Sequence, residues 1–379
     1  MSIAIFIPSL AGGGAEKVAV ILANEFAELG HHVHLVVATT LPEKYESEVD
    51  GNVNLVKLES SRLIYSVTKF SNFIKRTQPE VVLAIKADAS IIAKFSLILA
   101  GSNKKTRLYV REAISNEFKE EGPRSAGSII IAALTTWTYN SVDGIISPSS
   151  VLALSIAKKY PKQKNIRHIN NPVVTSSFES QVSEKSFVSP WDESARIILS
   201  VGRLSDQKDY FTLLKAFRRL RDKADYKLMI LGEGPERPGL LEYIRNHELD
   251  QHCSLPGFVP NPLPYLKQAQ LFVLSSKYEG LPNVLIQALA CGTRAVATDC
   301  PTGPAEILQH GRIGKLVPVG DSELLANAML ETLGASDIST QQRLNISEQV
   351  KNTYCATKVA KEFLDYLQDG WHPDASAPD

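Results

Sequence analysis

The chain has 379 residues, with 41 basic and 41 acidic side chains and a formal net charge of zero at pH 7. This length accommodates two domains, and the balanced charge argues against a nucleic-acid-binding protein, which normally carries a basic excess. No apolar run approaches the roughly 18–20 residues that a membrane-spanning helix needs. The four cysteines lack a Cys-x-x-Cys spacing, and the N-terminus lacks the basic region of a signal peptide, so we expect a cytoplasmic protein with reduced thiols.

The first half of the chain alternates between strand-like and helix-like patterns. Strands are predicted over residues 3–7, 34–37, 53–58, 81–85, 108–110 and 144–147. Helices are predicted over 16–29, 65–76 and 91–99. This alternation is typical of a parallel sheet covered by helices.

The periodicity stops over residues 170–193, which predicts a linker with a boundary near Val188. Beyond it, strands are predicted over 196–201, 227–231, 271–274 and 294–297, and helices over 210–222, 238–247, 282–290, 321–333 and 340–368. The tail over 371–379 has no periodic pattern and is expected to fray. The sequence therefore predicts α/β domains at 1–187 and 188–350, followed by a C-terminal helix and tail at 351–379.

The most informative segment runs from Ser275 to Gly292. It follows an apolar strand, and it contains a helix that is predicted to start near Pro282 and to end at Gly292. Glu279 comes just before this helix, and Gln287 lies about two turns inside it. Free backbone N–H groups at a helix start favour an anion such as phosphate, and ligands of parallel sheets bind beyond the carboxyl ends of the strands.

Within this segment, EGLPNVLIQALA resembles the donor-binding motif of the retaining glycosyltransferases of family 4, which have the GT-B fold. The family pattern is Glu-Gly-x-Pro, four residues, a second Glu and Ala-x-Ala, and this chain departs from it only at Gln287. Segments 291–308 and 198–217 and the Gly-rich opening IFIPSLAGGGAEKV are similar to further elements of the family. The resemblance covers most of the chain. It implies two Rossmann-like parallel-sheet domains facing a cleft, with the C-terminal helix crossing back to an acceptor-binding N-terminal domain.

Transfer of a sugar from a nucleotide diphosphate sugar depends mainly on positioning and on stabilising charge. By the resemblance, Arg203 and Lys208 bind the diphosphate, and Glu279 accepts hydrogen bonds from hydroxyls of the donor sugar. Arg suits bidentate binding of a phosphate, and Lys acts as a compact charge. Without the flanking motif, Arg203 and Lys208 would indicate only a solvated loop, and Glu279 only a carboxylate that suits the helix dipole.

The resemblance also implies a wider set of donor-binding residues. Glycines near the phosphates would let the backbone approach the ligand, although each one also suits a tight turn. The Gly-rich opening does not match the Gly-x-Gly-x-x-Gly motif that binds nicotinamide dinucleotides, because Lys17 occupies the position of the third glycine. The expected donor-binding residues are Gly12, Gly13, Gly14, Gly202, Gly257, Phe258, Val259, Gly280, Leu281, Pro282, Asn283 and Gln287.

Gln287 replaces the family's second Glu, which contacts the ribose hydroxyls through a carboxylate. A neutral amide still accepts one hydrogen bond, so the replacement is expected to weaken nucleotide binding by roughly tenfold. The alternative is a catalytically degenerate protein that only binds nucleotide sugar.

On the acceptor side, Lys86, Arg111 and Glu112 follow predicted strands and are the candidates for contact with the acceptor. Basic residues are concentrated in the N-terminal half, including Lys69, Lys75, Arg76, Lys104, Lys105 and Arg107. They indicate either a solvated face or attraction to the anionic inner leaflet of the plasma membrane.

The resemblance implies a retaining hexosyltransferase, and we expect it to need no metal or other cofactor. It would move a hexose or N-acetylhexosamine from a UDP-linked sugar to a glycan acceptor, either free or carried on a lipid, in bacterial surface polysaccharide biosynthesis. Nucleic acid is not an expected partner. The remaining alternatives are a nucleotide-sugar epimerase, which would need no acceptor, and a sugar phosphorylase, whose pyridoxal-phosphate lysine has no motif here.

Overall fold

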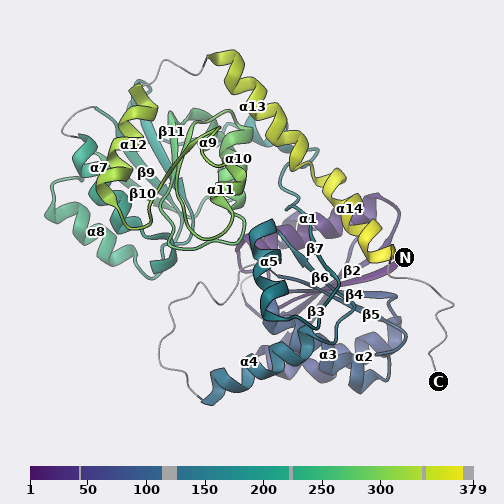
Figure 1. Cartoon of the computed structure of the whole chain (residues 1–379). Helices are drawn as coiled ribbons and strands as arrows, with labels where there is room; N and C mark the ends of the chain where they lie inside the picture. The colour runs from purple at the N-terminus through teal and green to yellow at the C-terminus, as the bar shows by residue number, and fades with distance from the viewer. Residues whose placement is uncertain (42–43, 113–125, 222–224, 335–338, 370–379) are drawn as a thin grey trace. The chain divides into compact units, whose positions relative to one another are not determined.

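The computed structural model of the chain describes residues 1–41, 44–112, 126–221, 225–334 and 339–369 (Figure 1). The chain divides into two compact units. Unit 1 consists of Met1–Val173 and the segment that starts at Cys355, and unit 2 consists of Val174–Tyr354. Each unit is an α/β layer structure with a parallel sheet, as the alternating patterns predict.

Unit 1 contains a seven-stranded parallel sheet in the order β3-β2-β1-β4-β5-β6-β7. The strands are β1 Ser2–Ile7, β2 His32–Thr39, β3 Asn54–Ser60, β4 Val81–Ile85, β5 Arg107–Arg111, β6 Gly144–Ser147 and β7 Ile166–His168. The chain first adds strands on one side of β1 and then continues from β4 in the other direction. Loops that follow β1 and β4 therefore diverge at the carboxyl edge of the sheet, where open parallel sheets bind ligands.

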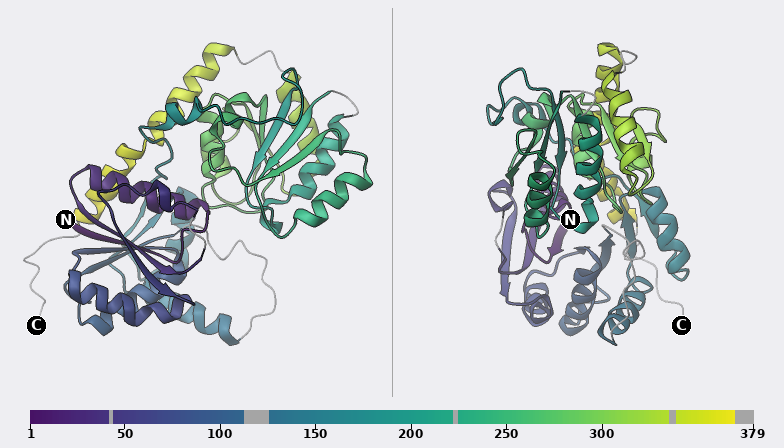
Figure 2. Two further views of the ribbon diagram at one scale, coloured as in Figure 1. Left: turned by 180° about the vertical axis from the view of Figure 1, so that it is seen from behind. Right: turned by 90° about the vertical axis from the view of Figure 1, so that its left-hand side faces the viewer.

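Helices cover both faces of this sheet (Figures 1 and 2). α1 Gly14–Glu28 and α14 Ala356–Asp369 pack on one face, where the rings of Phe26 and Phe363 lie 6.4 Å apart. The helices of the other face are α2 Ser66–Thr77, α3 Ala87–Ala100, α4 Ala126–Tyr139 and α5 Ser150–Lys159. The last helix of the chain thus belongs to unit 1, and its apolar stripe completes the core over β1 and β2.

Unit 2 contains a six-stranded parallel sheet in the order β10-β9-β8-β11-β12-β13. The strands are β8 Ile197–Val201, β9 Lys227–Leu231, β10 Cys253–Gly257, β11 Leu271–Leu274, β12 Ala295–Thr298 and β13 Lys315–Val317. The strand order reverses between β8 and β11. The loops after these two strands carry the residues that the sequence motifs single out.

The helices of unit 2 again lie on both faces of the sheet (Figure 1). α7 Tyr210–Arg221, α8 Arg237–Asn246 and α12 Ser322–Gly334 share one apolar core with β8, β9 and β11. The other helices are α6 Phe178–Val182, α9 Leu263–Gln268, α10 Asn283–Ala290, α11 Pro304–Ile307 and α13 Thr340–Thr353. Of these, α10 packs against both α9 and α13.

The division between the units comes at Val173, earlier than the boundary proposed from the sequence at 187/188. The segment after Val173 packs on unit 2. The hydroxyl of Tyr265 donates to the carbonyl of Ser186 at 3.1 Å, and the Tyr265 ring lies 5.1 Å from that of Phe187. A segment without helical periodicity can therefore still be an ordered part of a domain surface.

Two helix predictions need correction. The helix expected over 340–368 is two helices, α13 and α14, which are separated at Tyr354–Cys355 where the chain passes from unit 2 to unit 1. Pro282 is the N-cap of α10 and not its first residue, because its ψ of 97° is extended. The sequence patterns also did not identify α4, α5, α9, β7 or β13, and the tail over 371–379 lies outside the described residues.

Candidate functional site

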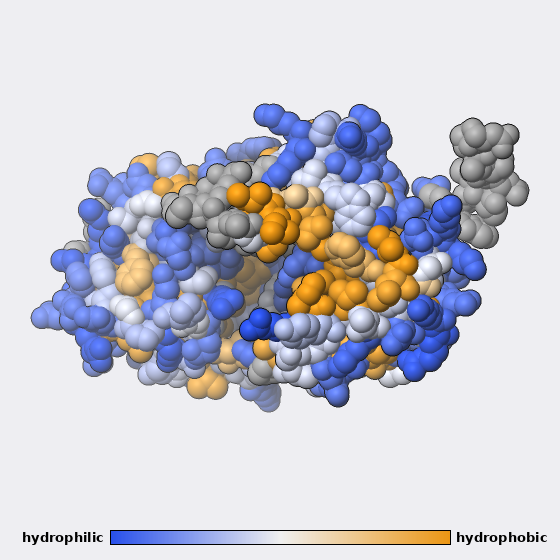
Figure 3. Space-filling view, turned by 90° about the horizontal axis from the view of Figure 1, so that it is seen from below, coloured by the Kyte–Doolittle hydropathy of each residue, from blue (hydrophilic) through white to orange (hydrophobic). Residues whose placement is uncertain are grey.

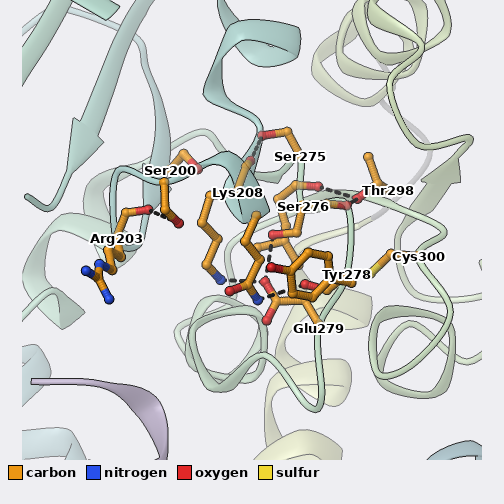
Figure 4. Close-up of polar contacts among 12 residues, drawn as sticks. Ser200, Arg203, Lys208, Ser275, Ser276, Tyr278, Glu279, Thr298 and Cys300 are labelled. Carbon is orange, nitrogen blue, oxygen red and sulfur yellow. Dashed lines mark hydrogen bonds and ion pairs between the residues drawn. The ribbon is translucent and has the colours of Figure 1, made fainter. Parts of the chain in front are cut away.

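In unit 2, the loops after β8 and β11 are joined by backbone and side-chain hydrogen bonds at the point where the strand order reverses (Figure 4). The amide nitrogen of Lys277 donates to the carbonyl of Gln207 at 2.8 Å. The Gln207 amide in turn donates to the carbonyl of Tyr278, and Ser275 Oγ donates to that of Lys208, both at 2.8 Å. These bonds hold the segments Gly202–Lys208 and Ser275–Glu279 as one rigid surface.

Lys208 and Glu279 form an ion pair on this surface. Their side chains are only 16% and 7% exposed, so the two charges are largely removed from water. Ser276 Oγ donates a second hydrogen bond to the same Glu279 Oε1 at 2.6 Å, and the Thr302 hydroxyl donates to the Glu279 carbonyl. A buried carboxylate needs such partners, and here they fix its orientation.

Arg203 lies on the same loop as Lys208 but is exposed. Its guanidinium points away from the Lys208–Glu279 pair in Figure 4. Unit 2 therefore brings two of the three expected catalytic residues into contact and leaves the third at the surface.

Glycines allow the loops of the site to pack closely. Gly232 follows β9 with φ of +142°, and a Cβ there would lie 1.9 Å from the Gly202 carbonyl oxygen. A Cβ on Gly234 would lie 2.2 Å from the carbonyl oxygen of Leu204. The sequence analysis did not single out these two glycines, although a Gly-x-Gly directly after a strand was a visible signal.

The EGLPN loop is largely buried and packs against the loop that follows β12. Gly280, Leu281 and Pro282 are buried, and Gly303 approaches so closely that its Cβ would lie 2.6 Å from the Gly280 carbonyl oxygen. Gln287 is half-buried in α10, and its side-chain amide makes no hydrogen bond to any described residue. Asn283 begins α10.

β10 ends at Gly257, and Phe258 and Val259 follow it beside the loop after β9. The amide nitrogen of Gly232 donates to the Gly257 carbonyl at 2.7 Å, and Phe258 is 36% exposed. Gly257 has φ of +98°, and a Cβ there would lie 2.7 Å from Glu233 Oε1. This turn therefore shares the carboxyl edge of the unit 2 sheet with the Lys208–Glu279 pair.

In unit 1, Gly12 and Gly13 lie in the connection from β1 to α1 at the corresponding edge of the first sheet, and Gly14 begins α1. The Lys86 ammonium pairs with buried Glu16 of α1 at 2.6 Å. The amide nitrogen of Lys86 also donates to the Arg111 carbonyl, which ties the ends of β4 and β5 together. Glu16 escaped the sequence analysis because its partner is 70 residues away.

Arg111 and Glu112 are buried, at 2% and 7% exposure. An Arg111 guanidinium nitrogen donates to Asn171 Oδ1 at 2.5 Å, and the Tyr139 hydroxyl donates to Glu112. Burial lowers the pKa of Arg111 to about 10, and the neighbouring carboxylates of Glu112 and Glu16 oppose that shift. Its Nη1 has no hydrogen-bond partner among the described residues.

Comparison with known proteins accounts for nearly the whole chain. Residues 12–177 match the family model of "Glycosyltransferase Family 4", and residues 181–353 match that of "Glycosyl transferases group 1". The chain is a glycosyltransferase of family 4 with the GT-B fold.

Two similar relatives are curated bacterial enzymes. The N-acetylgalactosamine-N,N'-diacetylbacillosaminyl-diphospho-undecaprenol 4-alpha-N-acetylgalactosaminyltransferase of Campylobacter jejuni is 27% identical over 376 residues, which cover 96% of this chain and 98% of the relative. The amylovoran biosynthesis glycosyltransferase AmsD of Erwinia amylovora is 26% identical over 355 residues, which cover 94% of this chain and 96% of the relative. Among solved structures, Anabaena HepE in complex with UDP superposes with a TM-score of 0.76 at 15% identity, over 97% of this chain and 100% of the other.

Two further properties of the described residues bear on this glycosyltransferase. No helix in the described part of the chain is both long and apolar enough to cross a membrane. The described residues contain no group of three or more His, Cys, Asp and Glu side chains that could hold a metal ion.

Proposed function

We propose that this glycosyltransferase transfers a hexose or N-acetylhexosamine from a UDP-linked sugar to a lipid-linked glycan acceptor in bacterial surface polysaccharide biosynthesis. Similarity to the Campylobacter and Erwinia enzymes over almost the full chain supports the acceptor class and the pathway class. The likeness to HepE with bound UDP supports the nucleotide. Contact with the inner face of the plasma membrane follows from a lipid-linked acceptor.

The observation that carries this proposal is the Lys208–Glu279 pair at the reversal point of the unit 2 sheet. Lys208 provides a positive charge for the leaving diphosphate. Glu279, already oriented by Lys208 and Ser276, accepts hydrogen bonds from hydroxyls of the donor sugar. Because these groups are held before the ligand binds, little reorganisation is needed as charge develops in the transition state.

In the proposed step, the bond between the anomeric carbon and the β-phosphate oxygen breaks, and its electron pair remains on that oxygen. The acceptor oxygen bonds to the anomeric carbon and gives its proton to the leaving phosphate, so no separate base is required. Arg203 reaches the diphosphate from the loop surface as a second cation. Two cations supply the charge neutralisation, so we propose that transfer is independent of added metal. An acceptor that gives its proton to the leaving phosphate attacks from the face on which the phosphate leaves, so we propose that the anomeric configuration is retained.

Of the three acceptor candidates in unit 1, Lys86 is the best placed to touch a ligand, because its side chain is 32% exposed. Arg111 and Glu112 are too buried for that role. We propose that they position the ends of β5 and the Asn171 segment instead.

The first experiment measures thermal stabilisation of the purified chain by UDP, GDP and ADP and by their sugar conjugates, with EDTA present. A ligand at 100 times its dissociation constant adds about 2.7 kcal/mol to the free energy of unfolding. Stabilisation by UDP and further by one UDP-sugar, followed by NMR detection of an axial product linkage with a lipid-linked acceptor, would support the proposal. Stronger stabilisation by GDP or ADP than by UDP would show that the donor carries that nucleotide instead. Transfer that occurred only with added metal would refute metal independence.

A second candidate is a nucleotide-sugar-binding protein without turnover, favoured by Gln287 at the position of the family's second Glu. It predicts binding of UDP-sugar with neither transfer nor hydrolysis. Transfer by the unmodified chain would exclude this candidate.

A further inference from the structure

The first half of α4 is apolar and exposed around its whole circumference. Residues 127–133 are all exposed, and Ile129, Ile130 and Ile131 are 57%, 60% and 57% exposed. Consecutive helical residues are about 100° apart, so three adjacent isoleucines cover more than half of the helix circumference. None of the 14 residues of α4 is charged. Such a helix is normally surrounded by apolar material, yet the described residues of unit 1 leave this part uncovered.

The exposed apolar surface continues from α4 onto α3. Phe95, Ile98 and Leu99 of α3 are 38%, 45% and 51% exposed. The ring of Phe95 lies 5.5 Å from that of Trp137 on α4, and Trp137 is itself 41% exposed. Figure 3 shows hydrophobic side chains gathered in a band on this face of the molecule. We call these residues of α3 and α4 the α3–α4 apolar face, and a contiguous face of this kind marks an interaction site.

The charges beside this face are mainly positive. The neighbouring helices α2, α3 and α4 contain four basic residues and one acidic residue, namely Lys69, Lys75, Arg76 and Lys94 against Asp88. Lys104 and Lys105, just after α3, are also exposed. A basic rim beside an apolar face complements an anionic membrane, where each cation near the surface contributes about 1 kcal/mol.

The shape of the apolar surface favours a bilayer over a folded partner. A protein surface covers one side of a helix, whereas lipid chains can enclose it from several directions. With 14 residues, α4 is about 21 Å long and is too short to cross a hydrocarbon core of about 30 Å. Trp137 at the far end of α4 suits the boundary between headgroups and chains, where aromatic residues concentrate.

We propose that the α3–α4 apolar face inserts into the interface of an anionic bilayer, with the isoleucines of α4 among the acyl chains and the basic residues at the headgroups. Such a surface would bring the protein to the membrane that holds a lipid-linked acceptor. Its biological role therefore rests on the proposed function. Hydrophobic insertion rather than charge alone would hold the protein, because the amines of Lys69 and Lys94 already donate hydrogen bonds to backbone carbonyls.

The test is sedimentation of the full chain with vesicles of phosphatidylglycerol and phosphatidylcholine, without donor or acceptor. Ile130→Asp is expected to weaken vesicle binding by about tenfold or more, because it removes apolar area that the bilayer would bury and adds a charge. The matched control is Leu344→Asp, which replaces an exposed apolar residue of α13 in unit 2 and should leave binding unchanged. Equal binding by Ile130→Asp and the original chain would overturn the proposal.

Salt and depth measurements separate insertion from surface attraction. Binding should persist in 0.5 M salt, which screens surface charges. In a chain with Trp191→Phe and Trp371→Phe, Trp137 should be quenched by lipids brominated on the acyl chains. Loss of binding in high salt, or no quenching, would overturn insertion. A change of oligomeric state caused by Ile130→Asp, with no vesicle binding by the original chain, would instead identify this face as a self-association surface.

A further measurement distinguishes failure of this inference from failure of the proposed transfer. Ile130→Asp should transfer sugar normally to an acceptor that has been released from its lipid, or hydrolyse donor at the original rate. If vesicle binding is strong while no sugar is transferred, only the proposed function fails. If transfer is normal while vesicles are not bound, only the membrane surface fails.

Discussion

Lys208 and Glu279 are 71 residues apart in sequence and form a buried ion pair at the carboxyl edge of the unit 2 sheet. The Glu279 side chain is the more buried of the two, at 7% exposure against 16% for Lys208. The pair therefore has a structural consequence in addition to its proposed role in catalysis. A carboxylate that loses its cation inside a protein costs free energy, whereas a flexible lysine can move its charge into water.

Replacing Lys208 should destabilise the fold more than replacing its partner. We expect Lys208→Met to lower the free energy of unfolding by about 3 kcal/mol, because it leaves Glu279 buried without its cation. Glu279→Gln should cost less, and the double variant should recover most of the loss. Chemical denaturation of the three variants checks this. A double variant as unstable as Lys208→Met would show that the unpaired Glu279 carboxylate is not the cause of the lost stability.

Arg203 should behave in the opposite way, because it is exposed and points away from the pair (Figure 4). We expect Arg203→Ala to leave the melting temperature unchanged and to lower kcat by about 100-fold, as is typical when one charge-stabilising group is removed. Arg218→Ala, at another exposed arginine in α7, is the matched control and should retain full activity. Normal turnover by Arg203→Ala would remove Arg203 from the proposed mechanism.

The strand pattern predicted both parallel sheets, but it did not determine which strand ends meet. Arg203, Lys208 and Glu279 all follow strands that the sequence predicted, yet only the strand order places the loop after β8 against the loop after β11. The same limit hid Glu16, Asn171 and Tyr139, whose partners Lys86, Arg111 and Glu112 are 70, 60 and 27 residues away. Such contacts leave no local periodicity for a sequence pattern to detect.

α4 escaped prediction for a different reason. Its sequence, AGSIIIAALTTWTY, has apolar residues on every side, so it lacks the single apolar stripe that identifies an ordinary surface helix. From the sequence, the length of the apolar run at 129–134 showed only that it is too short for a membrane-spanning helix. That Ile129, Ile130 and Ile131 are exposed became apparent only from the packing of unit 1.

The cysteines provide a pH-dependent test of the core of unit 2. Burial raises the pKa of the Cys253, Cys291 and Cys300 thiols from 9.0 to about 12. Since unfolded thiols ionise first, this contribution to stability is complete below pH 9 and is lost as the pH rises through about 12. In the native protein at pH 8, iodoacetamide should label only half-exposed Cys355, as mass spectrometry of peptides can show. Labelling of Cys300 under native conditions would contradict the burial of this thiol, which is 2% exposed.

Gln287 offers the sharpest test of whether the donor site is intact. Its amide is half-buried on α10 and makes no hydrogen bond to the described residues, so it is available to a ligand. We expect Gln287→Glu to tighten UDP binding by roughly tenfold, because a charged acceptor gains about 1.4 kcal/mol over a neutral one with a ribose hydroxyl. Gln268→Glu, at an exposed position in α9, adds the same charge away from the site and should leave affinity unchanged.

The kinetic outcome of the same substitution separates the two candidate functions. In an active transferase, Gln287→Glu should lower KM for the donor with little change in kcat, because the ribose lies away from the reacting carbon and its contact strengthens ground and transition states alike. In a degenerate protein, transfer would be absent from the original chain and would appear only in the variant. Calorimetric titration with UDP, followed by transfer assays on both proteins, decides the matter. Weaker UDP binding by Gln287→Glu would place position 287 outside the ribose contact altogether.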